Sequence, residues 1–379
     1  MVESGDPKYK GLRSHGQRQG MGRLRRANSQ DTARIGGWEK HSDDDTFLEK
    51  HGKNSRRSHG GEALLAKFNR LAGDSITTHT MGMSGHVCGF AGMTVLVRDS
   101  EGIERFCIVR QNLKKRIAGV KNPLSIGDNV RFTMNNDEGV IEAVCPRTNQ
   151  LARTDSHNRA LLHIFAANID CLVIVAAMAE PELKYGLIDR YLLIAAYNAI
   201  NATVILTKSD LADTATPRAL YSSLQVPTFS ASIKTGDGIK AVGTHLAGKV
   251  CVFAGQSGVG KSSLINALYP DLAARVGSVA QAGHGRHTTT SSRSYSVANG
   301  GQLMDTPGIR ECGITGMQPL DVALLYADIA AQHPLCRFDD CSHLHEPDCA
   351  VQAAVANGSI AASRYESYRS ILNEDLATP

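Results

Sequence analysis

The sequence has no long hydrophobic segment. Its longest uninterrupted apolar run extends from Cys171 to Ala179, about half of the roughly 20 residues that a membrane-spanning helix needs. The N-terminus starts with polar and charged residues and lacks the apolar centre of a secretory signal peptide. These absences argue against a membrane-spanning or secreted protein.

Cysteine is too sparse for a disulfide framework. The chain of 379 residues has nine cysteines, and only those between Cys336 and Cys349 are crowded together. This distribution favours a protein of the reducing cytoplasm that carries one metal site. An internal repeat is also absent.

Charge is nearly balanced overall but unevenly placed. The net charge is +4, yet residues 1–30 alone carry +5, so the rest of the chain is close to neutral. Residues 1–82 are rich in Gly, Ser, Arg, His and Asn, contain the only tryptophan, Trp38, and show no sustained apolar period. We expect a flexible basic arm there, either a solvated tail without a partner or a contact to nucleic acid.

Residues 83–153 change to short β-rich segments separated by turn residues. Strands at this spacing predict a small closed barrel. The five expected strands are His86–Phe90, Met93–Val97, Arg105–Val109, Asn129–Thr133 and Gly139–Ala143.

Residues 154–316 alternate apolar strands with helical stretches. The apolar runs Cys171–Ala177, Ala202–Leu206 and Val250–Ala254 are typical of buried parallel strands, and Leu187–Ala199 has a helical pattern. We therefore expect an α/β domain. Residues 317–379 follow as a separate module, with helices expected at Asp321–Ala331 and Ser359–Leu376.

A phosphate-binding loop follows the strand Val250–Ala254 and precedes a helical segment, Ser263–Leu268. Glycines let successive N–H groups cradle phosphate oxygens, Lys261 reaches the β and γ phosphates, and the Ser262 hydroxyl ligates Mg²⁺. The residues expected to bind nucleotide here are Gly255, Gln256, Ser257, Gly258, Val259, Gly260, Lys261, Ser262 and Ser263.

Two further segments lie where they can read a base. Thr207, Lys208, Ser209 and Asp210 follow the strand Ala202–Leu206, and Ser230 and Ala231 follow the strand-like Gln225–Phe229. An aspartate such as Asp210 can accept both N–H groups of the guanine edge, which adenine lacks. A third segment, Asp305-Thr-Pro-Gly308, comes after Gln302–Met304. There Asp305 would hold Mg²⁺ and the Gly308 N–H would sense the γ phosphate.

The order of these motifs is permuted, because the base-reading residues precede the phosphate loop and Asp305 comes last. From Gly85 onward the chain resembles the RsgA (YjeQ/EngC) family of circularly permuted GTPases. The resemblance includes the barrel segment, Gly285–Thr290 and the cysteine cluster. It implies an OB-fold barrel, a circularly permuted P-loop GTPase domain and a mainly helical zinc-binding C-terminal module. It further implies GTP hydrolysis in maturation of the small (30S) ribosomal subunit, stimulated by that subunit.

Two positions depart from ordinary GTPases. Thr207 replaces the usual Asn that braces the phosphate loop, which predicts weaker nucleotide binding. Ile309 stands where many GTPases have the Gln that orients the attacking water. By analogy, Thr289 would complete the Mg²⁺ shell with Ser262 and Asp305, and His287 would position the water. We expect His287, Lys261 and Gly308 to act in catalysis, with slow intrinsic turnover.

The cysteine cluster offers three thiolates and an imidazole within fourteen residues. This donor set suits a closed, tetrahedral, structural Zn²⁺ site. The family resemblance matches the same positions, Cys336, Cys341, His343 and Cys349; His333 and His345 are expected to be non-ligands.

A run of cations at the end of a barrel strand is the expected RNA contact. OB-folds use such loops on nucleic acid, although a solvated charge run is the alternative. The residues are Arg110, Lys114, Lys115 and Arg116.

The sequence thus predicts a monomeric cytoplasmic GTPase that binds GTP, GDP and rRNA of the small ribosomal subunit. An rRNA-binding assembly protein in which nucleotide acts only as a switch, with negligible turnover, is the competing hypothesis. An ATP-dependent kinase or ATPase is disfavoured by Asp210 and by the lack of an acceptor site.

Overall fold

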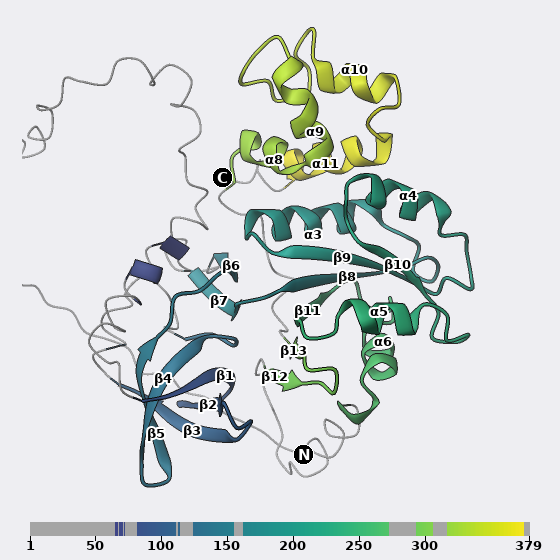
Figure 1. Cartoon of the computed structure of the whole chain (residues 1–379). Helices are drawn as coiled ribbons and strands as arrows, with labels where there is room; N and C mark the ends of the chain where they lie inside the picture. The colour runs from purple at the N-terminus through teal and green to yellow at the C-terminus, as the bar shows by residue number, and fades with distance from the viewer. Residues whose placement is uncertain are drawn as a thin grey trace, which may run out of the picture. The chain divides into compact units, whose positions relative to one another are not determined.

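The computed structural model of the protein describes residues 65, 66, 68–70, 72, 82–110, 113, 124–154, 162–272, 293–305 and 317–374. This part of the chain contains a β-barrel, an α/β sheet and a C-terminal group of helices, as Figure 1 shows. The multidomain fold class predicted from the sequence is confirmed. No helix within these ranges is long and apolar enough to cross a bilayer.

The barrel closes in the strand order β1-β2-β3-β5-β4. Its neighbours pair antiparallel except β3 and β5, which run parallel, and β1 closes onto β4. This pairing is the five-stranded topology of an OB-fold, as expected. The strands are β1 (Met83–Ala91), β2 (Thr94–Asp99), β3 (Glu104–Val109), β4 (Asn129–Asn135) and β5 (Glu138–Val144).

The barrel core extends N-terminally beyond the expected start of the barrel. Phe68 and Ala72 are buried among the barrel's apolar side chains, and the Asn69 side chain exchanges hydrogen bonds with the backbone of Arg147. The Arg147 guanidinium lies 3.7 Å from the centre of the Phe68 ring. The described residues 65, 66, 68–70 and 72 are therefore helical and are attached to the barrel through these contacts, where the sequence predicted only a flexible arm.

Between barrel and sheet lies a short antiparallel pair, β6 (Gln150–Thr154) and β7 (Leu162–Ala167), which the sequence analysis did not predict. Arg147 forms a fully buried ion pair with Asp128, 2.6 Å from Nε to Oδ1, and also donates to Gln150. The expected domain boundary between residues 153 and 154 falls inside β6.

The α/β sheet has six strands in the order β10-β9-β8-β11-β13-β12, all parallel except β12. Its strands are β8 (Cys171–Ala177), β9 (Asn201–Thr207), β10 (Thr228–Ala231), β11 (Val250–Ala254), β12 (Arg293–Ser296) and β13 (Gln302–Asp305). Around it lie α3 (Tyr185–Tyr197), α4 (Ala215–Ser223), α5 (Ile239–His245) and α6 (Lys261–Leu268). The central strands β8 and β11 are apolar throughout because helices cover both faces of the sheet, so their side chains on both faces are buried.

Strand β10 differs from its prediction. We expected Gln225–Phe229, whereas the strand begins at Thr228. Gln225 has a left-handed backbone, with φ of 60°, and Pro227 lacks the N–H that a strand would donate. The turn that leaves α4 thus occupies the first residues of the predicted strand.

The C-terminal module contains α8 (Pro319–Leu325), α9 (Ala327–Gln332), η2 (His333–Leu335), α10 (Ala350–Ala356) and α11 (Ala362–Glu374). The single helix expected at Asp321–Ala331 is wrong, because Tyr326 is extended, with ψ of 100°. Its buried ring packs edge-on against Tyr368, with 5.6 Å between ring centres. The Ala-rich α10, directly after Cys349, was not predicted.

Candidate functional site

The three segments predicted to bind the base and the phosphates of the nucleotide meet at one edge of the sheet. Strands β8, β9, β10 and β11 run parallel, so the loops that follow them all leave at their carboxyl ends. Thr207 at the end of β9 is the register partner of Ala231 in β10 and of Ala177 in β8. Segments that are permuted along the chain are therefore brought together, as the sequence predicted.

The phosphate loop begins at Gly255, whose φ is +146°. A Cβ at this position would lie 2.2 Å from the carbonyl oxygen of Val175, so only glycine fits against β8. Gly260, with φ of 88°, is the N-cap residue of α6. The Lys261 ammonium donates to the carbonyls of Gly255 and Gln256 at 2.8 and 2.7 Å. The lysine thus lies against the loop that would hold the phosphates.

Thr207 contacts the phosphate loop directly. Its buried hydroxyl lies 2.6 Å from the carbonyl oxygen of Val259 and 3.2 Å from that of Ala176. A hydroxyl carries one proton, and the shorter contact with Val259 is the stronger hydrogen bond. Threonine therefore contacts the phosphate loop at the position where ordinary GTPases have asparagine. The weaker nucleotide binding predicted from this difference stays a prediction.

Asp210 is held by a residue that the sequence analysis did not single out. The buried Ser232 hydroxyl donates to Asp210 Oδ1 at 2.6 Å, and this hydrogen bond lowers the pKa of the exposed carboxyl. The ionised carboxylate can only accept, which suits a base edge that presents two N–H groups. Ser232 could have been found from the sequence, because it comes two residues after Ser230 and directly after Ala231, which were predicted to bind the base.

Backbone and side-chain contacts fix the neighbouring base-reading residues. The Ser209 N–H donates to the Ala231 carbonyl at 3.3 Å, which joins the two segments. Ser230 donates from its hydroxyl to Thr214 at 2.8 Å. The Lys208 ammonium donates to the carbonyl oxygen of Glu180. Both segments are thereby tied to the loops beside them.

The expected Mg²⁺ ligands Ser262 and Asp305 line one cavity of about 390 Å³ together with Lys261. Asp305 is exposed at this cavity, yet the surrounding protein removes enough water to raise the pKa of its carboxyl. A bound cation would favour the ionised form. Thr289, His287 and Gly308, predicted for the same site, lie outside the described residues.

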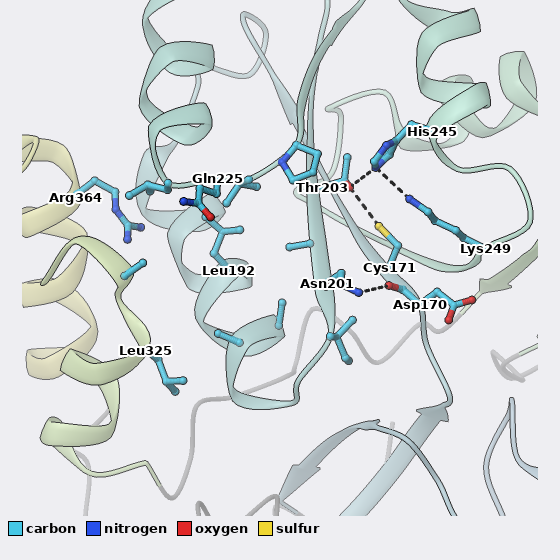
Figure 2. Close-up of a pocket in the computed structure, with 18 residues that line it drawn as sticks. Asp170, Cys171, Leu192, Asn201, Thr203, Gln225, His245, Lys249, Leu325 and Arg364 are labelled. Atoms are coloured by element: carbon cyan, nitrogen blue, oxygen red, sulfur yellow. Dashed lines mark hydrogen bonds between the residues drawn. The ribbon is translucent and has the colours of Figure 1, made fainter. Parts of the chain in front are cut away.

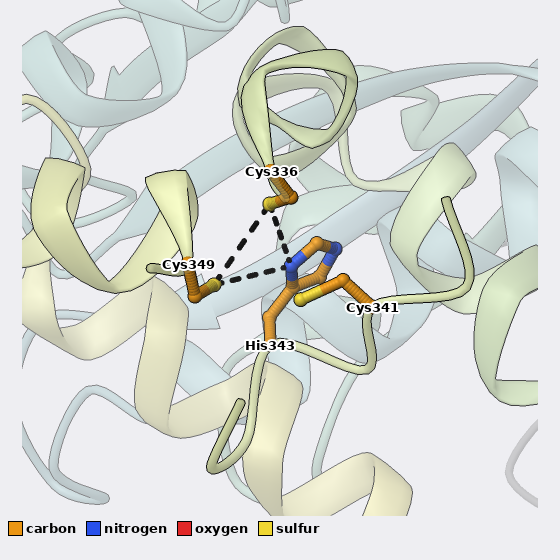
Figure 3. A group of neighbouring side chains, drawn as sticks. All are labelled: Cys336, Cys341, His343 and Cys349. Atoms are coloured by element: carbon orange, nitrogen blue, oxygen red, sulfur yellow. Dashed lines mark hydrogen bonds between the residues drawn. The ribbon is translucent and has the colours of Figure 1, made fainter. Parts of the chain in front are cut away.

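The cysteine cluster comes together as predicted. The ligand atoms of Cys336, Cys341, His343 and Cys349 all lie within 4.8 Å of one another (Figure 3). His343 Nδ1 is 3.5 Å from the Cys336 sulfur and 3.4 Å from the Cys349 sulfur, and those sulfurs are 3.9 Å apart. Ligands of a tetrahedral ion with thiolate and imidazole donors lie about 3.5 to 3.8 Å apart. The donor set and its spacing therefore fit such an ion.

His333 contacts the cluster through His343. Its Nδ1 lies 3.0 Å from Nε2 of His343, the nitrogen that faces away from the thiols. Burial and His333 together lower the pKa of His343 to about 4, so the imidazole is neutral and can bind a metal. The tyrosines of α11 fix the backbone, since Tyr365 donates to the His343 carbonyl at 2.6 Å. The supporting role of His333 could not be predicted from spacing alone.

Of the predicted RNA contacts only Arg110 lies within the described residues. Its guanidinium pairs with Glu142 at 2.9 Å while remaining about half exposed. Lys114, Lys115 and Arg116 lie outside them. The RNA-binding surface therefore stays a prediction.

The chain is similar to proteins of known class. Residues 144–315 match the family described as RsgA GTPase. The small ribosomal subunit biogenesis GTPase RsgA of Actinobacillus pleuropneumoniae serotype 5b (strain L20) is 39% identical over 277 residues, covering 70% of this chain and 78% of the relative. The RsgA of Porphyromonas gingivalis (strain ATCC 33277) is 37% identical over 308 residues, covering 78% of this chain and 98% of the relative.

Two solved structures are similar over most of the chain. The crystal structure of YjeQ from Thermotoga maritima has a TM-score of 0.65 and 32% identity, and the match covers 78% of this chain and 99% of YjeQ. YloQ, described as a circularly permuted GTPase, has a TM-score of 0.63 and 27% identity over 79% of this chain and 97% of YloQ. With its permuted motifs, OB-fold barrel and Cys/His cluster in place, this chain belongs to the RsgA GTPase family.

Proposed function

We propose that this protein hydrolyses GTP to GDP and phosphate as an assembly checkpoint of the small ribosomal subunit. One observation carries the choice of base. The Asp210 carboxylate, which accepts a hydrogen bond from Ser232 that lowers its pKa, lies at the same sheet edge as a phosphate loop that Thr207 contacts. Adenine presents no pair of donors to such a carboxylate.

We assign the phosphate and metal contacts to the cavity that Lys261, Ser262 and Asp305 line. Lys261 would leave the loop carbonyls for the β and γ phosphates, and Ser262, Thr289 and Asp305 would hold Mg²⁺. The ion, when bound, neutralises charge that develops on the phosphates.

The attacking water has to be positioned without a glutamine, because Ile309 cannot hydrogen-bond. We assign this role to His287, with the Gly308 N–H at the γ phosphate. If the attacking water is ordered only when the protein is bound to its partner, the protein by itself hydrolyses GTP slowly. The small subunit should therefore stimulate hydrolysis.

For the C-terminal cluster we propose Zn²⁺. Three thiolates and one imidazole at these spacings match its preferred donors and its tetrahedral geometry. All four positions are filled by protein atoms, so the ion's role is to hold the module together. Residues 336–379 carry three arginines against seven acidic residues, and we infer that this module recognises its partner by shape or by protein contact.

RNA binding is assigned to the barrel and the basic N-terminal segment. Arg110, Lys114, Lys115 and Arg116 would contact the phosphate backbone of rRNA, with affinity that falls as salt rises. We further propose that the protein acts as a monomer in the cytoplasm.

The experiment that tests the function is GTP hydrolysis by the purified protein with and without small ribosomal subunits. ATP in place of GTP and large subunits in place of small ones serve as controls. Stimulation by the small subunit with GTP alone is the expected result. A slow rate that stays flat while the subunit binds would favour the nucleotide-switched rRNA-binding protein, and equal use of ATP would favour an ATPase.

A further inference from the structure

Two cysteines lie side by side in the α/β sheet, in neither the nucleotide site nor the metal cluster. Cys171 opens β8 and Cys251 is the second residue of β11, and the two are register partners on neighbouring parallel strands. Partners in such a pair point to the same face, and neighbouring strands are about 4.8 Å apart. Disulfide-bonded cysteines have Cα atoms about 4.4 to 6.8 Å apart, so the spacing of these two strands lies within the range that a disulfide needs.

A chain of hydrogen bonds leads from Cys171 to a base. The Cys171 thiol lies 3.4 Å from the Thr203 hydroxyl, which lies 3.0 Å from His245 Nε2. The Lys249 ammonium is 3.4 Å from the same nitrogen (Figure 2). An ammonium can only donate, so Nε2 of His245 is the hydrogen-bond acceptor and carries no proton. The proton of the Cys171 thiol can therefore pass through the Thr203 hydroxyl to His245.

The surroundings favour a neutral imidazole, which is the form that can take the proton. Burial and the Lys249 charge both lower the pKa of His245. Hydrogen bonds from Cys251 and Thr203 lower the pKa of Cys171 against the effect of burial. The buried barrel cysteines Cys88 and Cys107 differ, since burial raises the pKa of each to about 11.

Cys171 is only 2% exposed, but it lies at the wall of a pocket. Cys171, Thr203, His245 and Lys249 all line an open pocket of about 710 Å³ at the amino ends of β8 and β9. Cys251, its neighbour on β11, is not among the residues that line this pocket. Of the two thiols, Cys171 is therefore the one that borders the pocket.

We propose that Cys171 and Cys251 form a reversible disulfide when a peroxide enters this pocket. The Cys171 thiolate attacks the O–O bond, and the leaving hydroxide takes the proton held at His245, which yields a sulfenic acid and water. The Cys251 sulfur then displaces the sulfenic hydroxyl, which leaves as a second water with the Cys251 proton. One peroxide is thus reduced to two waters and two thiols are oxidised to one disulfide.

The bond can be detected in one digest. Trypsin releases Cys171 in the fragment 160–184 and Cys251 in the fragment 250–261, each with a single cysteine. The protein is treated with a few equivalents of hydrogen peroxide, alkylated and digested without reductant. We expect a peptide that links the two fragments, and its loss on reduction with dithiothreitol. Absence of the linked peptide after full peroxide consumption would overturn the proposal.

Two variants test the roles of the individual groups. Cys251→Ser should leave Cys171 as a sulfenic acid that dimedone labels, because no second thiol can displace its hydroxyl. Thr203→Val breaks the path to His245 while keeping the side-chain shape, and it should slow formation of the linked peptide at least tenfold. Nucleotide binding reports that each variant is folded. Oxidation of Cys88 and Cys107 as fast as Cys171, or an unchanged rate in Thr203→Val, would contradict activation by the hydrogen-bond chain.

Discussion

The Thr207 hydroxyl lies 2.6 Å from the carbonyl oxygen of Val259, so the strand that presents the base-reading residues also braces the phosphate loop. An asparagine is not required for this contact, because one hydroxyl proton is enough. The weaker nucleotide binding predicted from Thr207 in the sequence therefore stays a prediction, and the structure adds a contact through which this threonine can hold the loop.

Thr207→Val tests this brace. Valine has the same shape but leaves a buried carbonyl without its donor, which costs about 1 to 3 kcal/mol. GTP affinity should fall by about 5- to 150-fold if the cost appears fully in binding. Calorimetric titration measures it, and Thr207→Ser, which keeps the hydroxyl, should bind like the unmodified protein. Equal losses in both variants would assign the effect to packing.

Asp210→Asn tests base recognition. An asparagine amide can accept from N1–H and donate to a carbonyl at C2, so the variant should lose GTP and gain xanthosine triphosphate. Hydrolysis with both nucleotides provides the measurement. A variant that binds neither has lost the site as a whole, which a thermal denaturation curve would reveal.

Ser232→Ala tests whether the Ser232 hydrogen bond lowers the pKa of Asp210. The Ser232 hydrogen bond lowers the pKa of Asp210, so the accepting carboxylate is present above that pKa and is lost as pH falls through it. Without the hydroxyl the pKa rises, and GTP affinity should start to fall at a higher pH. Affinities measured from pH 7 down to pH 4 would show the shift; superimposed profiles would contradict it.

His287→Ala tests the positioned water. If His287 orients the water, kcat should fall by about 10²- to 10⁴-fold while GTP affinity changes little. Single-turnover hydrolysis in the presence of small subunits measures the first quantity and equilibrium titration the second. Parallel losses in both would show that His287 contributes to binding instead.

His333→Phe tests the support of the metal cluster. The phenyl ring fills similar space but cannot hydrogen-bond to His343 Nε2, and loss of such a partner weakens metal binding by about 10- to 100-fold. Competition with a chromogenic chelator measures the affinity. His345→Phe is the matched control, because His345 is exposed and is not among the cluster's ligands.

Arg364→Met tests how α11 is attached to α3. The buried guanidinium lies 2.7 Å from Asp189 of α3 and 2.9 Å from Asp328 of α9. Removing it leaves two carboxylates without their cation, which costs about 3 to 5 kcal/mol. The exposed pair of Arg337 and Asp348 is the control, since Arg337→Met should cost less than about 1 kcal/mol. Chemical denaturation compares the two; similar costs would show that burial is unimportant.

Several elements followed directly from the sequence. The strands β8 and β11 were predicted with their observed bounds, because short apolar runs rich in β-branched residues are typical of strands buried on both faces. The ligands Cys336, Cys341, His343 and Cys349 were found because thiols and imidazole so close in sequence have few other uses.

Other features escaped prediction because they depend on residues far apart in the chain. The break at Tyr326 results from contacts with Tyr368, and Phe68 is buried by a barrel that begins more than ten residues later. Such contacts leave no periodic pattern in the local sequence.

By itself the sequence determined the family of this protein, through a phosphate-loop motif and the permuted motif order, and it predicted a guanine-reading carboxylate and a cluster of four side chains that could hold a metal. Side-chain chemistry and short spacings are local properties, so they can be read along the chain. Only the tertiary structure decided that Thr207 reaches Val259, that Ser232 holds Asp210 and that Cys171 faces Cys251. Those pairs are set by which strands become neighbours and in what register, and both depend on how the whole sheet packs.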